Sequence, residues 1–126
     1  MQAFSIITHK KEEMVNITKE VQDMISIDTG ICYIFLRHAT AGVFINENEE
    51  GLKEDFLNMF GGLINDRDWK HNKIDNNASA HMKASLVGQS VFVPVKDRKL
   101  QLGRWQSIFL IEFDGPRQRE LIIEVR

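Results

Sequence analysis

Three of the four histidines stand at positions where an imidazole ring can take part in chemistry. His38 follows a run of apolar residues, His71 lies in a long polar stretch, and His81 is near the start of a segment rich in small residues. Three neutral imidazoles that converge and leave one position open form a common catalytic metal site, usually occupied by zinc. The spacing of these histidines matches no short metal-binding motif. Two interpretations follow: a three-histidine metal centre, or three structural histidines that each make an ordinary hydrogen bond.

Several polar side chains lie near these histidines along the chain. Asn46 and Glu47 come soon after His38, at the end of a short apolar segment, so we expect them to face the same pocket. Asp75 lies between the other two histidines and can orient an imidazole by accepting its second N–H. The alternative for each of these residues is an ordinary solvated side chain.

Three arginines in the C-terminal part are candidates for contacts with phosphate: Arg104, Arg117 and Arg119. A planar guanidinium group binds phosphate through two parallel hydrogen bonds. The alternative is surface charge. The chain contains no Gly-x-Ser-x-Gly, no Gly-x-Gly-x-x-Gly and no Walker-type loop, so the sequence gives no support for a serine nucleophile or for the common nucleotide-binding loops.

We expect His81 to lie on a short helix over residues 76–88. Asn76 or Asn77 can cap its first backbone N–H groups, and Gly88 can end it because glycine tolerates a positive φ. Most side chains between these ends are small, which lets another stretch of backbone approach closely. The polar residues 66–77 before it form a long loop, and loops of this length in small domains are usually functional or disordered.

Apolar patterns predict the other elements. The continuous run Ile31–Leu36 predicts a strand buried on both faces, and apolar residues at helical spacing from Ile17 predict an amphipathic helix that ends at Gly30. Further strands are expected over residues 2–8, 43–45, 90–95, 108–113 and 121–125, and a further helix over residues 52–60. Lys96-Asp97-Arg98-Lys99 predicts a hairpin-like turn. Strands and helices do not alternate regularly. We therefore expect an α+β fold with a sandwich-like, mainly antiparallel core and about three flanking helices.

Composition fits one domain over residues 1–126. The net charge of −2 argues against a nucleic-acid partner. No apolar run approaches the roughly 20 residues that cross a bilayer, so no membrane association is expected. Cys32 is the only cysteine and cannot form an internal disulfide, which favours the cytoplasm.

Five motifs along the chain resemble one family. They are His38-Ala39-Thr40-Ala41-Gly42, Ile45-Asn46-Glu47-Asn48, Asn76-Asn77-Ala78-Ser79-Ala80-His81-Met82, Leu102-Gly103-Arg104-Trp105-Gln106 and Glu112-Phe113-Asp114-Gly115-Pro116-Arg117-Gln118-Arg119. In this order they are similar to the YjbQ family, also labelled secondary thiamine-phosphate synthases. The resemblance runs nearly from end to end.

The resemblance implies a β-rich domain that assembles as a homotrimer, with weak thiamine-phosphate synthase activity. It implies a polar pocket near His38, His71 and His81 that can bind a metal. The substrates of this reaction are small phosphorylated molecules: a pyrimidine diphosphate is joined to a thiazole phosphate, and pyrophosphate is expelled.

Three hypotheses about function remain open. The first is a synthase in which His38, His71, His81 and Glu47 are catalytic and Asn46, Gln106, Arg117 and Arg119 bind substrate. The second is a metal-dependent hydrolase that uses the same residues. The third is a non-catalytic trimeric protein whose histidines hold the subunit interface. A divalent metal bound by the three histidines would be zinc-like by ligand type, whereas transferase chemistry favours magnesium, which prefers oxygen ligands.

Overall fold

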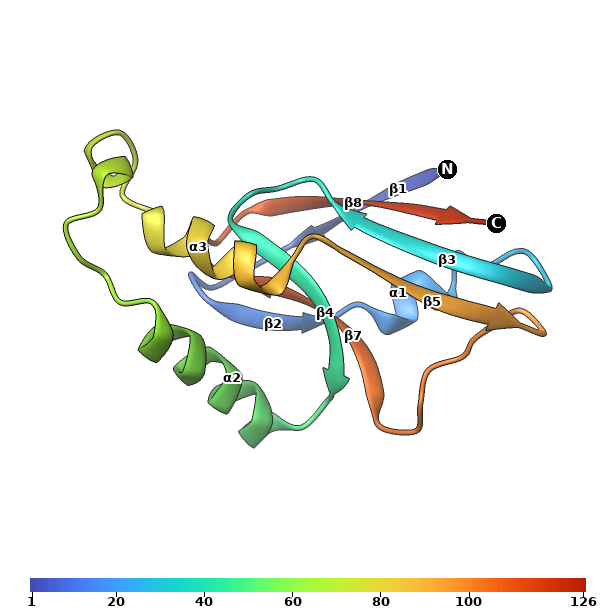
Figure 1. The fold of residues 1–126 in the computed structure, drawn as a ribbon. Helices are drawn as coiled ribbons and strands as arrows, with labels where there is room; N and C mark the ends of the chain where they lie inside the picture. The colour runs from blue at the N-terminus through green and yellow to red at the C-terminus, as the bar shows by residue number, and fades with distance from the viewer.

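Two antiparallel sheets form the centre of the computed structural model, which describes residues 1–126 (Figure 1). The elements run in the order β1 (Gln2–Ile7), β2 (Glu13–Asn16), α1 (Thr18–Gln22), β3 (Thr29–Leu36), β4 (Ala41–Glu47), α2 (Glu50–Leu63), η1 (Lys70–Lys73), α3 (Ala78–Val87), β5 (Ser90–Lys96), β6 (Lys99–Leu100), β7 (Gln106–Glu112) and β8 (Gln118–Val125). The strand order is β1-β8-β3-β5-β6 in one sheet and β2-β7-β4 in the other. This arrangement confirms the predicted α+β fold with an antiparallel core and three α-helices.

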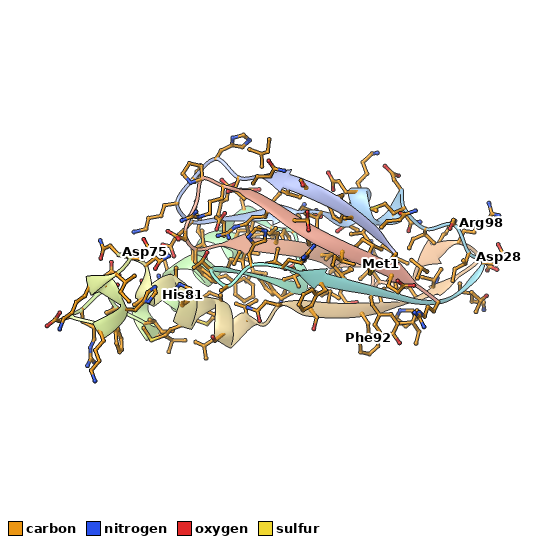
Figure 2. The ribbon with its side chains drawn as sticks, turned by 90° about the horizontal axis from the view of Figure 1, so that it is seen from above. Met1, Asp28, Asp75, His81, Phe92 and Arg98 are labelled. Carbon is orange, nitrogen blue, oxygen red and sulfur yellow. The ribbon has the colours of Figure 1, made fainter.

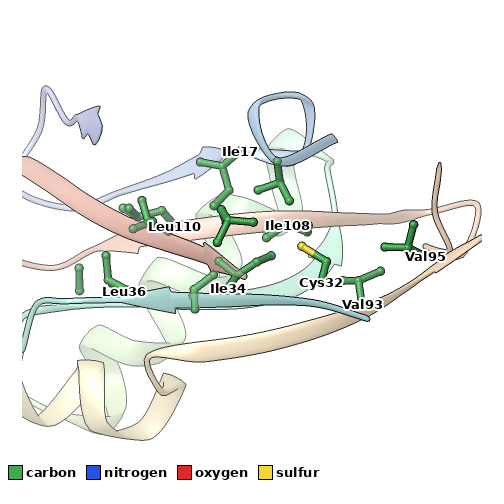
Figure 3. Packing of buried hydrophobic residues seen from close by; sticks show 13 residues of the cluster. Ile17, Cys32, Ile34, Leu36, Val93, Val95, Ile108 and Leu110 are labelled. Atoms are coloured by element: carbon green, nitrogen blue, oxygen red, sulfur yellow. The ribbon is translucent and has the colours of Figure 1, made fainter. Parts of the chain in front are cut away.

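The main core fills the space between the two sheets. On β3 the side chains of Cys32, Ile34 and Leu36 point inward, as strict alternation along a strand requires. They meet Ile108 and Leu110 of β7 from the opposite sheet (Figure 3). Burial raises the pKa of the Cys32 thiol to about 11, so this cysteine is an inert part of the core.

A second, smaller core lies on the other face of the three-stranded sheet. Phe109 and Ile111 of β7 point to this side and pack with Phe60 of α2 and Ala84 of α3. The central strand β7 is therefore buried on both faces, which explains its continuous apolar sequence.

Helices cover only the three-stranded sheet, and this corrects one prediction. The run Ile31–Leu36 forms β3 as expected, but the strand is not buried on both faces. Tyr33 is 46% exposed and Phe35 is 49% exposed, because no helix packs on the outer face of the five-stranded sheet.

The helix predicted from Ile17 to Gly30 is much shorter. Only Thr18–Gln22 is α-helical, and the residues before it form β2, which pairs with β7. The apolar residues of the predicted helix still belong to the core, since Ile17 and Val21 are fully buried and Met24 packs against the same core. Pairing with a central strand overrides the local helical pattern here.

Other local predictions are confirmed. Helix α3 covers Ala78–Val87 and ends at Gly88, whose φ is 92°. The β5–β6 hairpin turns at Asp97 and Arg98, which both have positive φ. None of the helices combines the length and the apolar character that a membrane span requires.

Candidate functional site

Helix α3 holds His81 close to the ends of several strands. Its small residues Ala80 and Ala84 are buried against the three-stranded sheet. Gly42 of β4 passes under the end of the helix, where an added Cβ would lie 2.6 Å from a methyl group of Val87. The backbone N–H of Val43 also donates to the carbonyl of Gly88 at 3.0 Å. These contacts fix α3 against β4, and with the helix they fix the position of the partly buried His81.

Three surface hollows meet at His81. The polar hollow, of about 480 Å³, is lined by His38, Asn77, His81, Asp114, Arg117 and Arg119 among others. The loop hollow, of about 620 Å³, includes Trp69, His71, His81 and Met82. The sheet hollow, of about 580 Å³, includes Phe35, His38, His81 and Ser85. His81 is the only residue that lines all three, and Figure 2 shows it near Asp75 at one end of the molecule.

His38 is held in one tautomer by a backbone N–H group near the start of β8. Its Nε2 accepts the backbone N–H of Glu120 at 2.9 Å, so this nitrogen carries a lone pair and the neutral ring has its hydrogen on Nδ1. The pKa of His38 lies below its ordinary value of 6.5, first because burial disfavours the charged ring and then because Arg119 is close. His38 therefore contributes a neutral ring to the polar hollow.

His71 lies beside His81 but on the side of the loop hollow. The two rings meet edge to face, with 4.8 Å between their centroids. The Nε2 of His71 makes a 3.0 Å hydrogen bond with Oδ1 of Asn77. The predicted partner Asp75 makes no hydrogen bond with either imidazole, although it lines the polar hollow. Asn77 has the orienting role that the sequence led us to expect of Asp75.

Arg119 is almost fully buried, with 2% of its surface exposed. Its Nε and Nη2 donate to the carboxylate of Glu112, which is itself 0% exposed, and Nη2 also donates to Oγ1 of Thr40 at 2.8 Å. Thr8 donates to the same carboxylate at 2.7 Å. Arg119 is thus first of all a structural residue, which the sequence did not predict.

One nitrogen of Arg119 remains free. Nη1 has no hydrogen-bond partner in the chain, and it is not completely enclosed, since every fully buried side-chain nitrogen or oxygen has a partner. Arg119 lines the polar hollow, and Nη1 is the one guanidinium nitrogen of Arg119 that is not already bonded within the chain. Arg117 lies at the same hollow and is half-exposed, with its guanidinium group bound to Asp114 through Nη2 at 2.9 Å and through Nε at 2.8 Å.

Three predicted site residues lie elsewhere in the chain. Strand β4 pairs with β7 from Ala41↔Glu112 at the histidine end to Glu47↔Gln106 at the other end. Six residues of extended strand span about 20 Å, so Asn46, Glu47 and Gln106 do not share a pocket with the histidines of the same chain. The prediction failed because the strand after His38 runs away from the site.

The three histidines do not form a metal-ligand set as they stand. No group of three or more His, Cys, Asp or Glu side chains is placed to hold a metal ion. The lone pair of His38 Nε2 accepts an amide N–H, and His71 Nε2 is bonded to Asn77. The carboxylate of Asp114 is bound by Asn77 and Arg117, which does not suit magnesium either. The predicted metal site does not fit these side chains, and whether the protein binds a metal stays untested.

Asn77 and Asp114 are polar residues of the site that sequence reasoning did not single out. They are joined by a 2.8 Å hydrogen bond from Nδ2 of Asn77 to Oδ2 of Asp114, across 37 positions of sequence. Each has an ordinary local explanation, Asn77 as a helix cap and Asp114 as part of a turn. No signal along the chain indicates that the two would meet.

The fold and the site define a class of small antiparallel α+β proteins with a histidine- and arginine-lined hollow at one end of a two-sheet core. The chain belongs to the family described as UPF0047 protein YjbQ-like, whose profile matches residues 2–126.

Relatives and solved structures agree with this assignment. A UPF0047 protein of Archaeoglobus fulgidus is 42% identical over 118 residues, which cover 93% of this chain and 94% of the relative. The UPF0047 protein YugU of Bacillus subtilis is 39% identical, over 99% of this chain and 98% of the relative. The crystal structure of a YbjQ-like protein of unknown function from Sulfolobus solfataricus P2 is 41% identical, with a TM-score of 0.95 over 98% of this chain and 94% of that chain.

Proposed function

We propose that the polar hollow binds the phosphate groups of a small substrate, and that the chain is an enzyme of the thiamine-phosphate synthase type. The observation that supports this most is the free Nη1 of Arg119. Glu112 and Thr40 hold the buried guanidinium group of Arg119 rigidly, and Arg119 lines the same hollow as Arg117. In this proposal its remaining N–H groups meet the phosphate in that hollow. Fixed donors of this kind bind anions without reorganising.

The proposed reaction joins a pyrimidine diphosphate to a thiazole phosphate and expels pyrophosphate. The negative charge that develops on the leaving group requires stabilisation, and Arg117 and Arg119 supply it in this proposal. His81 lies where the polar hollow meets the loop hollow, so it is placed to give a proton to a leaving oxygen. No step is assigned to a metal, because the histidines do not form a ligand set.

The test supplies both precursors to the purified protein and measures pyrophosphate release, with and without added zinc or magnesium. We expect release that falls by at least about tenfold in Arg117→Gln and His81→Gln variants, since one lost charge contact is worth about one factor of ten or more. Arg98→Gln is the matched control, because Arg98 lies at the opposite end of the molecule (Figure 2) and is 69% exposed.

Three outcomes would contradict this proposal. Absence of pyrophosphate release under all metal conditions excludes the synthase reaction. Equal loss in the Arg117→Gln and Arg98→Gln variants places the activity outside the polar hollow. Hydrolysis of generic phosphoesters without joining favours the hydrolase. Metal analysis of the purified protein beside a His81→Ala variant tests the metal prediction separately.

We also propose that the chain works as a homotrimer in the cytoplasm. Support for assembly comes from the uncovered outer face of the five-stranded sheet, where Tyr33 and Phe92 lie against each other with ring centroids 6.4 Å apart. A large exposed apolar patch of this kind usually marks an interaction site. The buried, unpaired thiol of Cys32 fits a reducing compartment. A trimer without any turnover favours the non-catalytic hypothesis.

A further inference from the structure

Asn77 occupies the N-cap position of α3, yet its side chain makes no capping hydrogen bond. The backbone N–H of Ala78 donates instead to Oδ1 of Asn72, at 3.0 Å. An asparagine at an N-cap normally stabilises its helix by accepting a backbone N–H. Here a second asparagine, Asn72, five residues before Asn77, accepts the first N–H of the helix, and the side chain of Asn77 is free for other partners.

The amide of Asn77 bridges two parts of the site. Nδ2 donates to the carboxylate of Asp114 at 2.8 Å, and Oδ1 is 3.0 Å from Nε2 of His71. A carboxylate only accepts hydrogen bonds, so the amide nitrogen must face Asp114 and the amide oxygen must face His71. His71 consequently has its hydrogen on Nε2, and in the neutral ring the lone pair is on Nδ1.

The chain of contacts continues to the polar hollow. Asp114 binds Arg117 through its carboxylate and through its backbone carbonyl. An unbroken series of hydrogen bonds therefore runs from His71 in the loop hollow through Asn77 and Asp114 to Arg117 in the polar hollow. His81 lines both of these hollows.

We infer that Asn77 is a positioning residue that joins the two hollows into one site, because it holds His71 in a single orientation and, through Asp114, holds Arg117 at the polar hollow. The bridge itself stands on these contacts, and only its consequence for turnover rests on the proposed function. Asn77 does not touch the reacting atoms in this proposal and acts through its two neighbours.

Substitution by aspartate separates this role from helix capping. Asparagine and aspartate are about equally good N-caps, and a negative charge at a helix N-terminus is favourable. A capping role therefore predicts that Asn77→Asp leaves the melting temperature unchanged or raises it. The bridge predicts a clear fall, because the new carboxylate loses the N–H donor and faces Asp114 as a like charge.

Two further variants complete the design. Asp114→Asn in the Asn77→Asp background exchanges amide and carboxylate, so we expect it to restore most of the lost melting temperature. Asn76→Asp is the matched control, since Asn76 is exposed and its side chain makes no hydrogen bond. We expect it to behave like the unmodified protein.

A direct readout covers the case in which Asn77→Asp does not fold. Asn77→Ser keeps a capping side chain but is too short to bridge. We expect the side-chain 15N shifts of His71, measured at one fixed pH, to move in Asn77→Ser and to stay in place in Asn76→Asp. An unchanged His71 signal in Asn77→Ser, or a neutral or raised melting temperature in Asn77→Asp, overturns the inference.

Both measurements are made without substrate, so they stand even if the proposed synthase reaction fails. If that reaction is found, Asn77→Ser should raise the KM for the diphosphate by about tenfold, because a small displacement of a binding group is costly.

Discussion

Arg119 is the buried cation of the polar hollow, and it is paired with the buried carboxylate of Glu112. The Glu112 carboxylate neutralises the guanidinium group, and the hydroxyl groups of Thr8 and Thr40 make further hydrogen bonds to the pair. A buried ion pair contributes little net stability, but removal of one partner leaves an uncompensated buried charge. The pair therefore fixes the geometry of the hollow more than it stabilises the fold.

Arg119→Met should lower the free energy of unfolding by about 3–5 kcal/mol, because Glu112 is left charged and buried. Urea denaturation measures the loss. Arg98→Met is the control and should change stability by no more than about 0.5 kcal/mol, since Arg98 is exposed. Adding Glu112→Gln to Arg119→Met should recover part of the loss. A loss below about 1 kcal/mol in the single variant contradicts the structural role of Arg119.

His38 predicts a defined dependence of stability on pH. Its pKa is lower in the folded protein than the ordinary 6.5, because burial and Arg119 disfavour the charged ring. Between the lowered value and 6.5 the unfolded chain binds more protons than the folded one, so the contribution of His38 to stability is present above pH 6.5 and falls as the pH is lowered.

The corresponding variant is His38→Gln, whose amide oxygen can still accept the N–H of Glu120. We expect the difference in melting temperature between the unmodified protein and His38→Gln to shrink as the pH falls from 7.5 to 5. The variant lacks the imidazole of His38, so its melting temperature still varies with pH through all the other titrating groups but not through His38. A difference that stays constant over this range means that the environment of His38 does not disfavour its charged form.

At the scale of elements, the position of α3 depends on a glycine beneath it. Gly42→Ala places a methyl group 2.6 Å from Val87 and 2.9 Å from the carbonyl of Gly88. We expect a loss of about 1–3 kcal/mol in the free energy of unfolding, as for other overpacked sites. We also expect weaker activity, since His81 moves with the helix.

Gly61→Ala provides the opposite case. Gly61 is inside α2 with nothing within 4 Å of an added Cβ, so the substitution should stabilise the protein by about 0.5–1 kcal/mol. If both variants change stability in the same direction, the close contact between β4 and α3 does not control the position of the helix.

The sequence predicts elements well where local patterns and burial agree. Helix α3, its end at Gly88 and the turn at Asp97 follow from residue types alone. The strand β2 was missed because its pairing with β7 is a contact between distant segments. The outward face of β3 was misjudged for a related reason, since its exposure depends on where the helices pack.

The same distinction applies to the site. Histidines and arginines can be chosen by residue type, and the structure brings His38, His81, Arg117 and Arg119 to one hollow. Their partners cannot be chosen in this way. The link between Asn77 and Asp114, and the distance between Glu47 and the histidines, depend on strand directions that no local pattern encodes.

At the scale of the whole molecule, the two sheets differ in how far their faces are covered. The three-stranded sheet lies between the main core and the helices, whereas the five-stranded sheet has one face without any covering element. Phe92 is 62% exposed on that face, beside Tyr33 and Phe35. This face is the surface on which we expect copies of the chain to assemble.

Phe92→Lys should convert the expected trimer to monomers, because a lysine ammonium group in an apolar interface costs several kcal/mol unless it is paired. Light scattering coupled to size-exclusion chromatography measures the mass. Leu63→Lys is the control, since Leu63 is equally exposed but lies at the end of α2. A monomeric unmodified protein, or an unchanged trimer in Phe92→Lys, excludes this face as the interface.

The position of β8 has a consequence for the way the chain folds as it is made. Strand β8 follows the other strands of its sheet in the chain, yet it lies between β1 and β3 in the five-stranded sheet. Until residues 118–125 emerge, β1 has no partner and one edge of β3 is open. Pairing between segments this distant slows folding, and open edges invite contact with other chains. We therefore expect a nascent chain whose residues 118–125 have not yet emerged to be more prone to aggregate than one in which β8 has paired.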